Sequence, residues 1–298
     1  MPQSTMTSQD PTLRIAIIGG GIGGLCLAAG LSRLPHLSIH VYESVPAYSD
    51  VGAGLALHMN AIKAMALIGP HVKQAYFDKA LTMAEEAEEE MSTTVSLASG
   101  PNAGAVVAEL GKAKGRKTVA RADLLAELLE LVPEECISFG RRLERIVEEA
   151  NGVQLSFKDG ERVEVDCVVG CDGVHSITRK YLLGEGHPAT APVNHDGWQI
   201  YRTLIPAEEA KKYIDEKYTR TVPILCGPKG HINCMPLHQG KDVSAGVAVR
   251  GARKPGMTET PELRVEDFEG YIKDAQDIVK VREASPSLEK GTDLADGG

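Results

Sequence analysis

A glycine-rich turn follows directly after a short apolar strand near the start of the chain. Residues 15 to 18 read Ile-Ala-Ile-Ile, and Gly-Gly-Gly-Ile-Gly-Gly follows at Gly19–Gly24. A second apolar strand then closes on an acid, Glu43. This order of strand, G-x-G-x-x-G turn, helix, strand and acid predicts the first βαβ unit of a Rossmann-like parallel sheet.

Each glycine of the fingerprint has its own physical task. Gly19 makes the tight turn, Gly21 lets a pyrophosphate approach the backbone, and Gly24 lets the helix pack closely on the strand. The helix N-terminus presents free N–H groups and the positive end of its dipole to the phosphates. A carboxylate at Glu43 accepts hydrogen bonds from ribose hydroxyls but would repel a 2′-phosphate. The pattern therefore predicts a site for a dinucleotide such as NAD or FAD, in preference to NADP.

Size, charge and cysteine usage narrow the class of protein. The 298 residues, 43% of them hydrophobic, predict one large or two modest domains. A formal net charge of -9 argues against nucleic acid or an anionic membrane as the main partner. No stretch approaches eighteen apolar residues, so we expect no membrane span. The polar first twelve residues do not resemble a targeting peptide, and six scattered cysteines predict reduced thiols, so we expect a cytoplasmic protein.

Hydrophobic periodicity and turn residues predict an α/β fold in two consecutive parts. The first part is a Rossmann-like parallel-sheet domain with a β-hairpin or meander insertion, and the second is an antiparallel β-sheet domain. The Gly- and Pro-rich segment 184–194 is the predicted boundary. The predicted division is a disordered tail at 1–12, a nucleotide-binding domain at 13–184, a substrate-binding β-sheet domain with a helix at 185–283, and an unstructured tail at 284–298.

The individual elements follow from the same signals. In the first half we expect strand Leu13–Ile18, helix Gly23–Leu34, strand Ser38–Glu43, a helix capped by Asn60, a helix over 71–90, a hairpin ribbon over Met91–Lys117 and a helix opened by Arg121. In the second half we expect strands at Leu143–Glu148, Val153–Phe157 and Val163–Val165 with a hairpin turn at Asp159-Gly160, a strand at Cys167–Gly170 covered on both faces, strands at Trp198–Ile205, Val222–Cys226, Ile232–Leu237 and Val243–Val249, and helices near 207–217 and 261–283.

Two further motifs allow a functional and a structural interpretation. Asp172 and Gly173 follow the predicted strand at its carboxyl end, where open α/β sheets bind ligands. An Asp-Gly turn before a helix capped by Ser176 would equally be ordinary chain punctuation. Arg121 begins a helix, where the helix dipole favours anions. It either faces a bound phosphate or flavin edge, or it is a surface arginine paired with Asp123 or Glu127.

Taken in order along residues 13 to 237, these motifs resemble a known family. They are Gly19-x-Gly21-x-x-Gly24 with Glu43, Asp50-Val51-Gly52-Ala53-Gly54-Leu55 with Asn60, Arg121-x-Asp123-Leu124, and Cys171-Asp172-Gly173-x-x-Ser176-x-x-Arg179. The chain is similar to the single-component FAD-dependent aromatic monooxygenases, in their salicylate hydroxylase-like branch with the para-hydroxybenzoate hydroxylase fold. The resemblance implies a small aromatic substrate, O₂, bound FAD, and NAD(P)H as a transient co-substrate without a domain of its own.

The resemblance also implies roles for single residues. Glu43 would hold the adenosine ribose and the Gly19–Gly24 turn the pyrophosphate; Gly54 to Ala56 would run beside the flavin, Arg121 would contact FAD, and Asp172 would shape the cofactor groove. Glu43→Ala and Arg121→Ala would then weaken FAD binding without affecting the fold. Arg202 matches an arginine that lies beside flavin and substrate, where a guanidinium would favour a phenolate or carboxylate. The alternative is a structural role, that of an arginine on the outer surface of a strand.

The chain departs from the family pattern in two places. The family often has an aromatic residue where this chain has Met235, so a tyrosine-assisted deprotonation does not carry over. His231 is a candidate base, or a structural histidine on a strand. We find no third cofactor motif, a strand followed by Gly-Asp, in residues 238–298.

The expected function is hydroxylation of a phenolic or aromatic small molecule. One alternative is a truncated, catalytically impaired flavin-binding remnant. The other is an oxidoreductase of another type that binds FAD or NAD.

Overall fold

The computed structural model describes residues 12–48, 54–80, 90–114, 118–191, 198–250 and 262–284. The chain forms two compact units: unit 1 contains Met1–Tyr48 and Leu128–Pro192, and unit 2 contains Ser49–Glu127 and Val193–Gly297. Neither unit is continuous in sequence, because strands from distant segments pair within one sheet. The predicted consecutive domains differ from this grouping at residues 49–127, which belong to unit 2.

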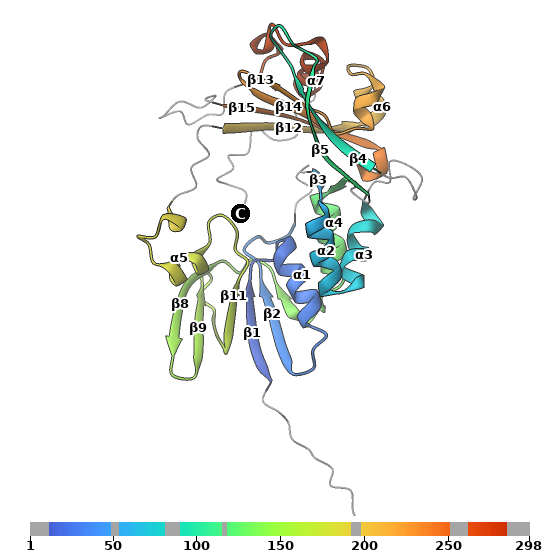
Figure 1. Cartoon of the computed structure of the whole chain (residues 1–298). Helices are drawn as coiled ribbons and strands as arrows, with labels where there is room; N and C mark the ends of the chain where they lie inside the picture. The colour runs from blue at the N-terminus through green and yellow to red at the C-terminus, as the bar shows by residue number, and fades with distance from the viewer. Residues whose placement is uncertain are drawn as a thin grey trace, which may run out of the picture. The chain divides into compact units, whose positions relative to one another are not determined.

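Unit 1 is built on a parallel sheet with the strand order β11-β1-β2-β7. Its strands are β1 (Leu13–Ile18), β2 (Leu37–Tyr42), β7 (Ile137–Ser138) and β11 (Cys167–Gly170). Helix α1 (Ile22–Leu31) connects β1 to β2 and packs against both (Figure 1). Because β2 and β11 lie on opposite sides of β1, the strand order reverses at β1, which is where α/β sheets bind ligands. The predicted Rossmann-like arrangement is confirmed.

An antiparallel sheet and a short helix complete unit 1. The sheet has the order β10-β9-β8, from β8 (Leu143–Glu149), β9 (Gly152–Phe157) and β10 (Arg162–Val165). The predicted hairpin turn between β9 and β10 is confirmed. Leu155 and Phe157 pack with Ala16, Ile18 and Tyr42 in one buried cluster, which joins this sheet to the parallel one. The smaller elements are η1 (Glu134–Cys136), α5 (Ile177–Leu183) and η2 (Pro188–Thr190).

Unit 2 is built on a six-stranded sheet with the order β12-β15-β14-β13-β4-β5. Its strands are β4 (Glu90–Leu97), β5 (Val106–Lys114), β12 (Trp198–Pro206), β13 (Ile224–Gly227), β14 (Gly230–Leu237) and β15 (Asp242–Arg250). Neighbouring strands are antiparallel except β13 and β4, which are parallel. The predicted ribbon over 91–117 is confirmed as the hairpin β4–β5, and it extends the predicted antiparallel sheet.

Helix α7 (Lys273–Ala284) covers one face of this sheet (Figure 1). Ala275, Ile278 and Val279 of α7 lie in one buried cluster with side chains of β14 and β15 such as Ile232 and Val247. Along β14 and β15, every second side chain enters this cluster. The intervening side chains therefore lie on the opposite face, which we call the outer face.

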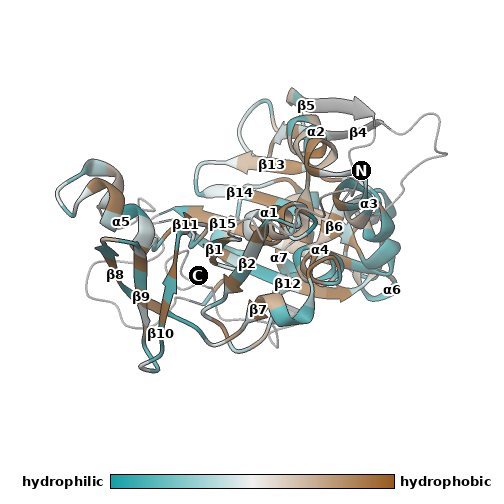
Figure 2. Ribbon diagram, turned by 90° about the horizontal axis from the view of Figure 1, so that it is seen from below, coloured by the Kyte–Doolittle hydropathy of each residue, from teal (hydrophilic) through white to brown (hydrophobic). Residues whose placement is uncertain are grey.

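The remaining elements of unit 2 are short. They are β3 (Gly54–Ala56), which pairs with β6 (Thr118–Ala120), the helices α2 (Met59–Ile68), α3 (Pro70–Lys79), α4 (Arg121–Leu129) and α6 (Ala207–Ala210), and the 3-10 turns η3 (Glu216–Thr219), η4 (His238–Gly240) and η5 (Val265–Phe268). Much of α3 and α6 is coloured as hydrophilic in Figure 2, in keeping with their sequences. Within the described residues, no helix is both long and apolar enough to span a bilayer.

Several predicted boundaries need correction. Asn60 is not a cap, because α2 starts at Met59 after an extended His58 that makes no side-chain cap bond. The helix predicted over 71–90 ends at Lys79, and Glu90 already belongs to β4. Residues 81–89, with most of the acidic run, lie outside the described residues. The two predicted terminal tails also lie outside them, apart from residue 12 and from Ala284, which ends α7.

Three predictions in the second half also change. The strand Cys167–Gly170 is only partly buried, because β11 forms the edge of its sheet. The helix expected near 207–217 is a four-residue helix, α6, which places Ala210 in the core, and the turns that follow it place Ile214 there. The helical prediction over 261–283 holds from residue 273, where α7 begins.

Candidate cofactor and substrate site

The glycines of the Gly19–Gly24 turn are required for different reasons. Gly19 has φ +104°, and a Cβ there would lie 2.3 Å from the Cys171 carbonyl oxygen. A Cβ on Gly24 would lie 2.0 Å from the Gly19 carbonyl oxygen, so helix and strand pack as closely as predicted. A Cβ on Gly21 would have nothing within 4 Å. The packing of the chain therefore requires glycine at 19 and 24, whereas position 21 borders open space.

The start of α1 has the properties of an anion site. Gly21 is its extended N-cap residue, and no side chain caps the helix. The first turn carries no acidic residue. The first N–H groups of a ten-residue helix thus face the open space at Gly21, with the positive end of the helix dipole behind them. This cradle fits the diphosphate of a dinucleotide.

Glu43 lies at the carboxyl end of β2 and is 7% exposed. One carboxylate oxygen accepts a hydrogen bond from the Gly20 N–H at 2.6 Å. The other accepts from the Val45 N–H at 2.9 Å and the Ser44 hydroxyl at 3.1 Å. A carboxylate has about four acceptor positions, so Glu43 retains room for about one further donor, such as a single ribose hydroxyl.

Tyr48 is a neighbour of this site that the sequence analysis missed. Its hydroxyl donates to the Gly20 carbonyl at 2.5 Å, and its ring packs edge-on against Phe139 at 5.1 Å. Tyr48 therefore fixes the glycine turn from the side of Glu43. The only signal in the sequence is an aromatic residue in the loop after the acid.

The side chain of Asp172 makes its hydrogen bonds to residues of its own loop. The Asp172 carboxylate accepts from the hydroxyls of Ser176 and Thr178, both at 2.6 Å, and from the backbone N–H groups of Ile177 and Thr178 at 2.7 and 3.0 Å. Burial opposes ionisation of Asp172, but these hydrogen bonds outweigh it and lower its pKa. All four acceptor positions are used inside the loop. Any cofactor contact here would come from the backbone.

Ser176 and Arg179 complete the same loop. Ser176 is the N-cap of α5, as predicted, and its hydroxyl accepts from the Arg179 N–H at 2.8 Å. The Arg179 guanidinium donates to the carbonyls of Gly173, Val174 and Ala189 at 3.0, 2.6 and 3.0 Å. Because Gly19 packs on the Cys171 carbonyl, this clamped loop also supports the glycine turn.

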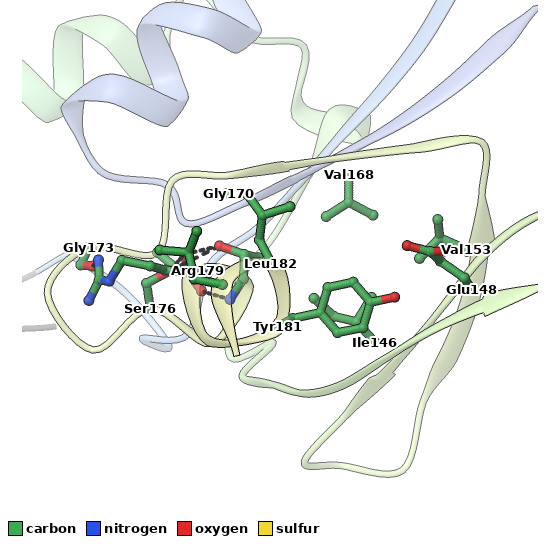
Figure 3. A pocket seen from close by; sticks show the side chains of 13 residues that line it. Ile146, Glu148, Val153, Val168, Gly170, Gly173, Ser176, Arg179, Tyr181 and Leu182 are labelled. Carbon is green, nitrogen blue, oxygen red and sulfur yellow. Dashed lines mark hydrogen bonds between the residues drawn. The ribbon is translucent and has the colours of Figure 1, made fainter. Parts of the chain in front are cut away.

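A pocket of about 500 Å³ lies beside this loop in unit 1 (Figure 3). Its apolar lining comes from β8, β9, β11 and α5 and includes Ile146, Val153, Val168 and Leu182. Burial and the neighbouring carboxylate of Glu148 raise the pKa of Tyr181, which also lines it. Of the residues predicted to bind the cofactor, the lining includes Asp172 and none of the glycine turn.

In unit 2, strand pairing brings Gly54 and Arg121 together. Gly54 on β3 is paired with Ala120 on β6, and Arg121 is the next residue. A Cβ on Gly54 would lie 2.4 Å from the Met235 sulfur, so β3 packs directly over β14. Ala56 ends the same strand, opposite Thr118. The predicted Gly54–Ala56 segment thus runs over the strand that carries Met235.

Arg121 is exposed at the first position of α4. The acids expected to pair with it have other partners. Asp123 lies 3.7 Å from the His238 ring, and Glu127 lies 3.0 Å from the Lys79 ammonium. Within the described part of the chain, no ion pair joins Arg121 to either acid. Its guanidinium remains available for an anion.

Arg202 lies on the outer face of the six-stranded sheet. It is exposed between the buried Tyr201 and Thr203 on β12. The outer face also carries Trp198 of β12, and His231, Asn233 and Met235 of β14. Burial lowers the pKa of His231, whose ring lies 5.9 Å from the ring of Trp198.

The predicted site residues thus fall into two sets. Gly19, Gly21, Gly24, Glu43 and Asp172 gather at the carboxyl ends of β1, β2 and β11 in unit 1. Gly54, Ala56, Arg121 and Arg202 belong to unit 2. Each set is assembled from segments far apart in sequence.

Comparison with known proteins adds to this geometry. No protein-family model matches the chain. The chain is 40% identical over 235 residues to the 6-methylsalicylate 1-monooxygenase atA of Aspergillus terreus, covering 77% of this chain and 52% of that protein. It is 31% identical over 259 residues to a salicylate hydroxylase of Pseudomonas putida, covering 85% of this chain and 58% of that protein. The chain therefore spans about half to three-fifths of the length of these relatives.

The fold also has solved counterparts. The structure of Klebsiella pneumoniae HpxO complexed with FAD and uric acid matches 95% of this chain and 68% of its own, with a TM-score of 0.72 at 21% identity. At 21% identity, this likeness shows the fold alone, and the more similar sequence relatives show the family. In sequence and fold, this chain belongs to the salicylate hydroxylase-like family of FAD-dependent aromatic monooxygenases.

Proposed function

We propose that this chain binds FAD and serves the hydroxylation of a small phenolic or aromatic acid, with NAD(P)H as transient electron donor and O₂ as oxidant. The observation that carries the proposal is the glycine turn, in which the protein's own packing explains Gly19 and Gly24 but leaves open space at Gly21. The names of its relatives, a 6-methylsalicylate monooxygenase and a salicylate hydroxylase, support the substrate class. We also propose a cytoplasmic location.

The residues of unit 1 would hold the adenosine diphosphate part of FAD. The N–H groups at the start of α1 would bind the diphosphate, and Glu43 would accept from a ribose hydroxyl. Tyr48 and the Asp172 loop would keep the turn in place without touching the cofactor through their side chains. Bound FAD would supply electron transfer from NAD(P)H and activation of O₂.

The residues of unit 2 would orient the aromatic substrate. The guanidinium of Arg202 would pair with a carboxylate or phenolate of the substrate. Where the partner is a phenolate, its negative charge makes the ring the better nucleophile. His231, whose pKa is lowered by burial, is neutral near pH 7 and able to accept a phenolic proton. Arg121 would offer a second positive charge to the cofactor.

The test is to purify the chain with added FAD and record flavin absorbance, NAD(P)H oxidation and product formation with 2-hydroxybenzoate. We expect Arg202→Ala to retain FAD and to lower kcat/KM about 10- to 100-fold, the value of one charge-assisted hydrogen bond of about 1.5–3 kcal/mol. Arg220→Ala, at another exposed arginine of unit 2, is the control and should change neither quantity.

Two outcomes decide between the alternatives. If the wild-type chain retains no FAD, the proposal fails. If it retains FAD and oxidises NAD(P)H without forming product, the chain is the catalytically impaired flavin-binding form that the sequence also allows.

A further inference from the structure

The outer face of the six-stranded sheet carries a polar side chain beside Arg202 that the sequence analysis did not single out. Arg202 on β12 is paired with Gly246 on β15, and Gly246 is paired with Asn233 on β14. Residues paired directly across a sheet lie on the same face. Arg202 and Asn233 therefore flank a position without a side chain.

The carboxamide of Asn233 leans into that position. A Cβ on Gly246 would lie 2.2 Å from the Asn233 Oδ1 atom and 3.4 Å from its Cγ atom. Asn233 thus extends from β14 over β15, in the direction of β12. Since neighbouring strands lie about 4.8 Å apart, its amide group is about one strand spacing from the strand that carries Arg202.

The Asn233 amide is half-buried, and it has no hydrogen-bond partner among the described residues. Half-buried amides in folded proteins usually have a partner in protein, water or ligand. The amide offers both donors and an acceptor, whereas a guanidinium offers donors and a charge. The pair is suited to a ligand with one anionic group and one neutral hydroxyl.

We infer that Asn233 is a specificity-determining residue, which hydrogen-bonds the ring hydroxyl of an aromatic acid whose carboxylate pairs with Arg202. This inference rests on the proposed function and narrows its substrate class. A hydroxyl and a carboxylate on neighbouring ring carbons leave the ring on the same side, as two side chains about one strand spacing apart require. Substituents at opposite ends of the ring would not reach both.

The test compares 2-hydroxybenzoate with benzoate as calorimetric probes of the full chain, with and without FAD. The wild-type chain should prefer 2-hydroxybenzoate about tenfold, equivalent to about 1.4 kcal/mol. Asn233→Ala should weaken 2-hydroxybenzoate about tenfold and change benzoate less than about twofold. Asn102→Ala, in the exposed β4–β5 turn, is the matched control and should keep the preference.

A second variant reaches the same group without removing it. Gly246→Ala places a Cβ where the Asn233 carboxamide lies, and the end of that side chain must move away. The preference for 2-hydroxybenzoate should fall in this variant as well. A preference retained in Asn233→Ala, or absent from the wild-type chain, overturns the inference.

Flavin absorbance of the same samples separates this inference from the proposed function. A chain that binds FAD and whose preference is unchanged by Asn233→Ala retains the proposed function and loses the inference. A chain that binds no FAD but still shows a preference dependent on Asn233 retains the inference and loses the proposed function.

Discussion

At the scale of single residues, the glycine turn separates two kinds of requirement. Gly24 packs against a backbone carbonyl of the protein itself, which cannot move aside cheaply. Gly21 has no such neighbour and has φ −67° and ψ −179°, which alanine also adopts. Fold and ligand binding should therefore respond differently at two positions of one motif.

We expect Gly24→Ala to lower the free energy of unfolding by about 1–3 kcal/mol, the usual cost of overpacking. Gly21→Ala should change stability by less than about 1 kcal/mol and weaken FAD binding about tenfold or more. Urea unfolding and flavin titration of both variants check this. Equal stability losses in the two variants would contradict it.

Glu43 illustrates how the structure revises an expectation drawn from sequence. Its carboxylate accepts from two backbone N–H groups, those of Gly20 and Val45, in a buried setting. Glu43→Ala leaves these donors without an acceptor, so we expect a loss of about 1–3 kcal/mol of stability in addition to weaker FAD binding. Arg121→Ala is the comparison, since Arg121 is exposed, and its urea midpoint should not move. A midpoint unchanged in Glu43→Ala would contradict the revised expectation.

At the scale of elements, the start of α5 depends on one ionised side chain. Asp172 holds the N–H groups of Ile177 and Thr178 at the first turn, in addition to the cap that Ser176 provides. Its pKa is lowered in the folded state, so its stabilising contribution is present above its unfolded pKa of about 4. The contribution is lost as the pH falls through the lower, folded pKa.

We expect Asp172→Asn to cost about 0.5–2 kcal/mol at neutral pH, as the loss of a helix cap does. The difference in stability from the wild-type chain should shrink as the pH falls from about 4 toward 2. Circular dichroism melting curves of both chains at several pH values measure this difference in stability. Subtracting one stability from the other removes the contributions of the carboxylates that the two chains share. A difference that grows on acidification would contradict the assigned direction.

At the scale of the whole molecule, distant segments are joined within each unit. In unit 1, the guanidinium of Arg14 in β1 forms an ion pair with the carboxylate of Asp166, just before β11, at 2.7 Å. In unit 2, Val95 of β4 is paired with Ile224 of β13. Pairings this far apart in sequence are the slow part of folding, because the loop must close before the contact forms.

The cysteines give a whole-molecule prediction. All six thiols are free, with Cys26 and Cys234 buried. Burial raises the pKa of Cys26 to about 11 and also raises the pKa values of Cys136, Cys171, Cys226 and Cys234. Because the thiolate is the reactive form, labelling with a thiol reagent at pH 7 should be slow in the native chain and rapid in denaturant. Fast native labelling of all six thiols would contradict this.

Much of the fold could be predicted from local signals. The bounds of β1 agree with the prediction, because a run of apolar residues ended by glycine allows little else. The β4–β5 ribbon, the β9–β10 hairpin and the start of α4 at Arg121 also agree, since each depends on neighbours in sequence. Asn60 failed as a cap, because the backbone, and not residue type alone, decides where a helix starts.

By itself, the sequence determined the βαβ unit, the positions of the glycines and the acid, and the family, because these depend on spacing along the chain. Only the tertiary structure decided which partners those residues have. It showed that the Asp172 carboxylate is used up inside its own loop, that Gly54 lies over Met235, and that Asn233 reaches toward the strand of Arg202. Such facts depend on strand register and packing between remote segments, which local pattern does not encode.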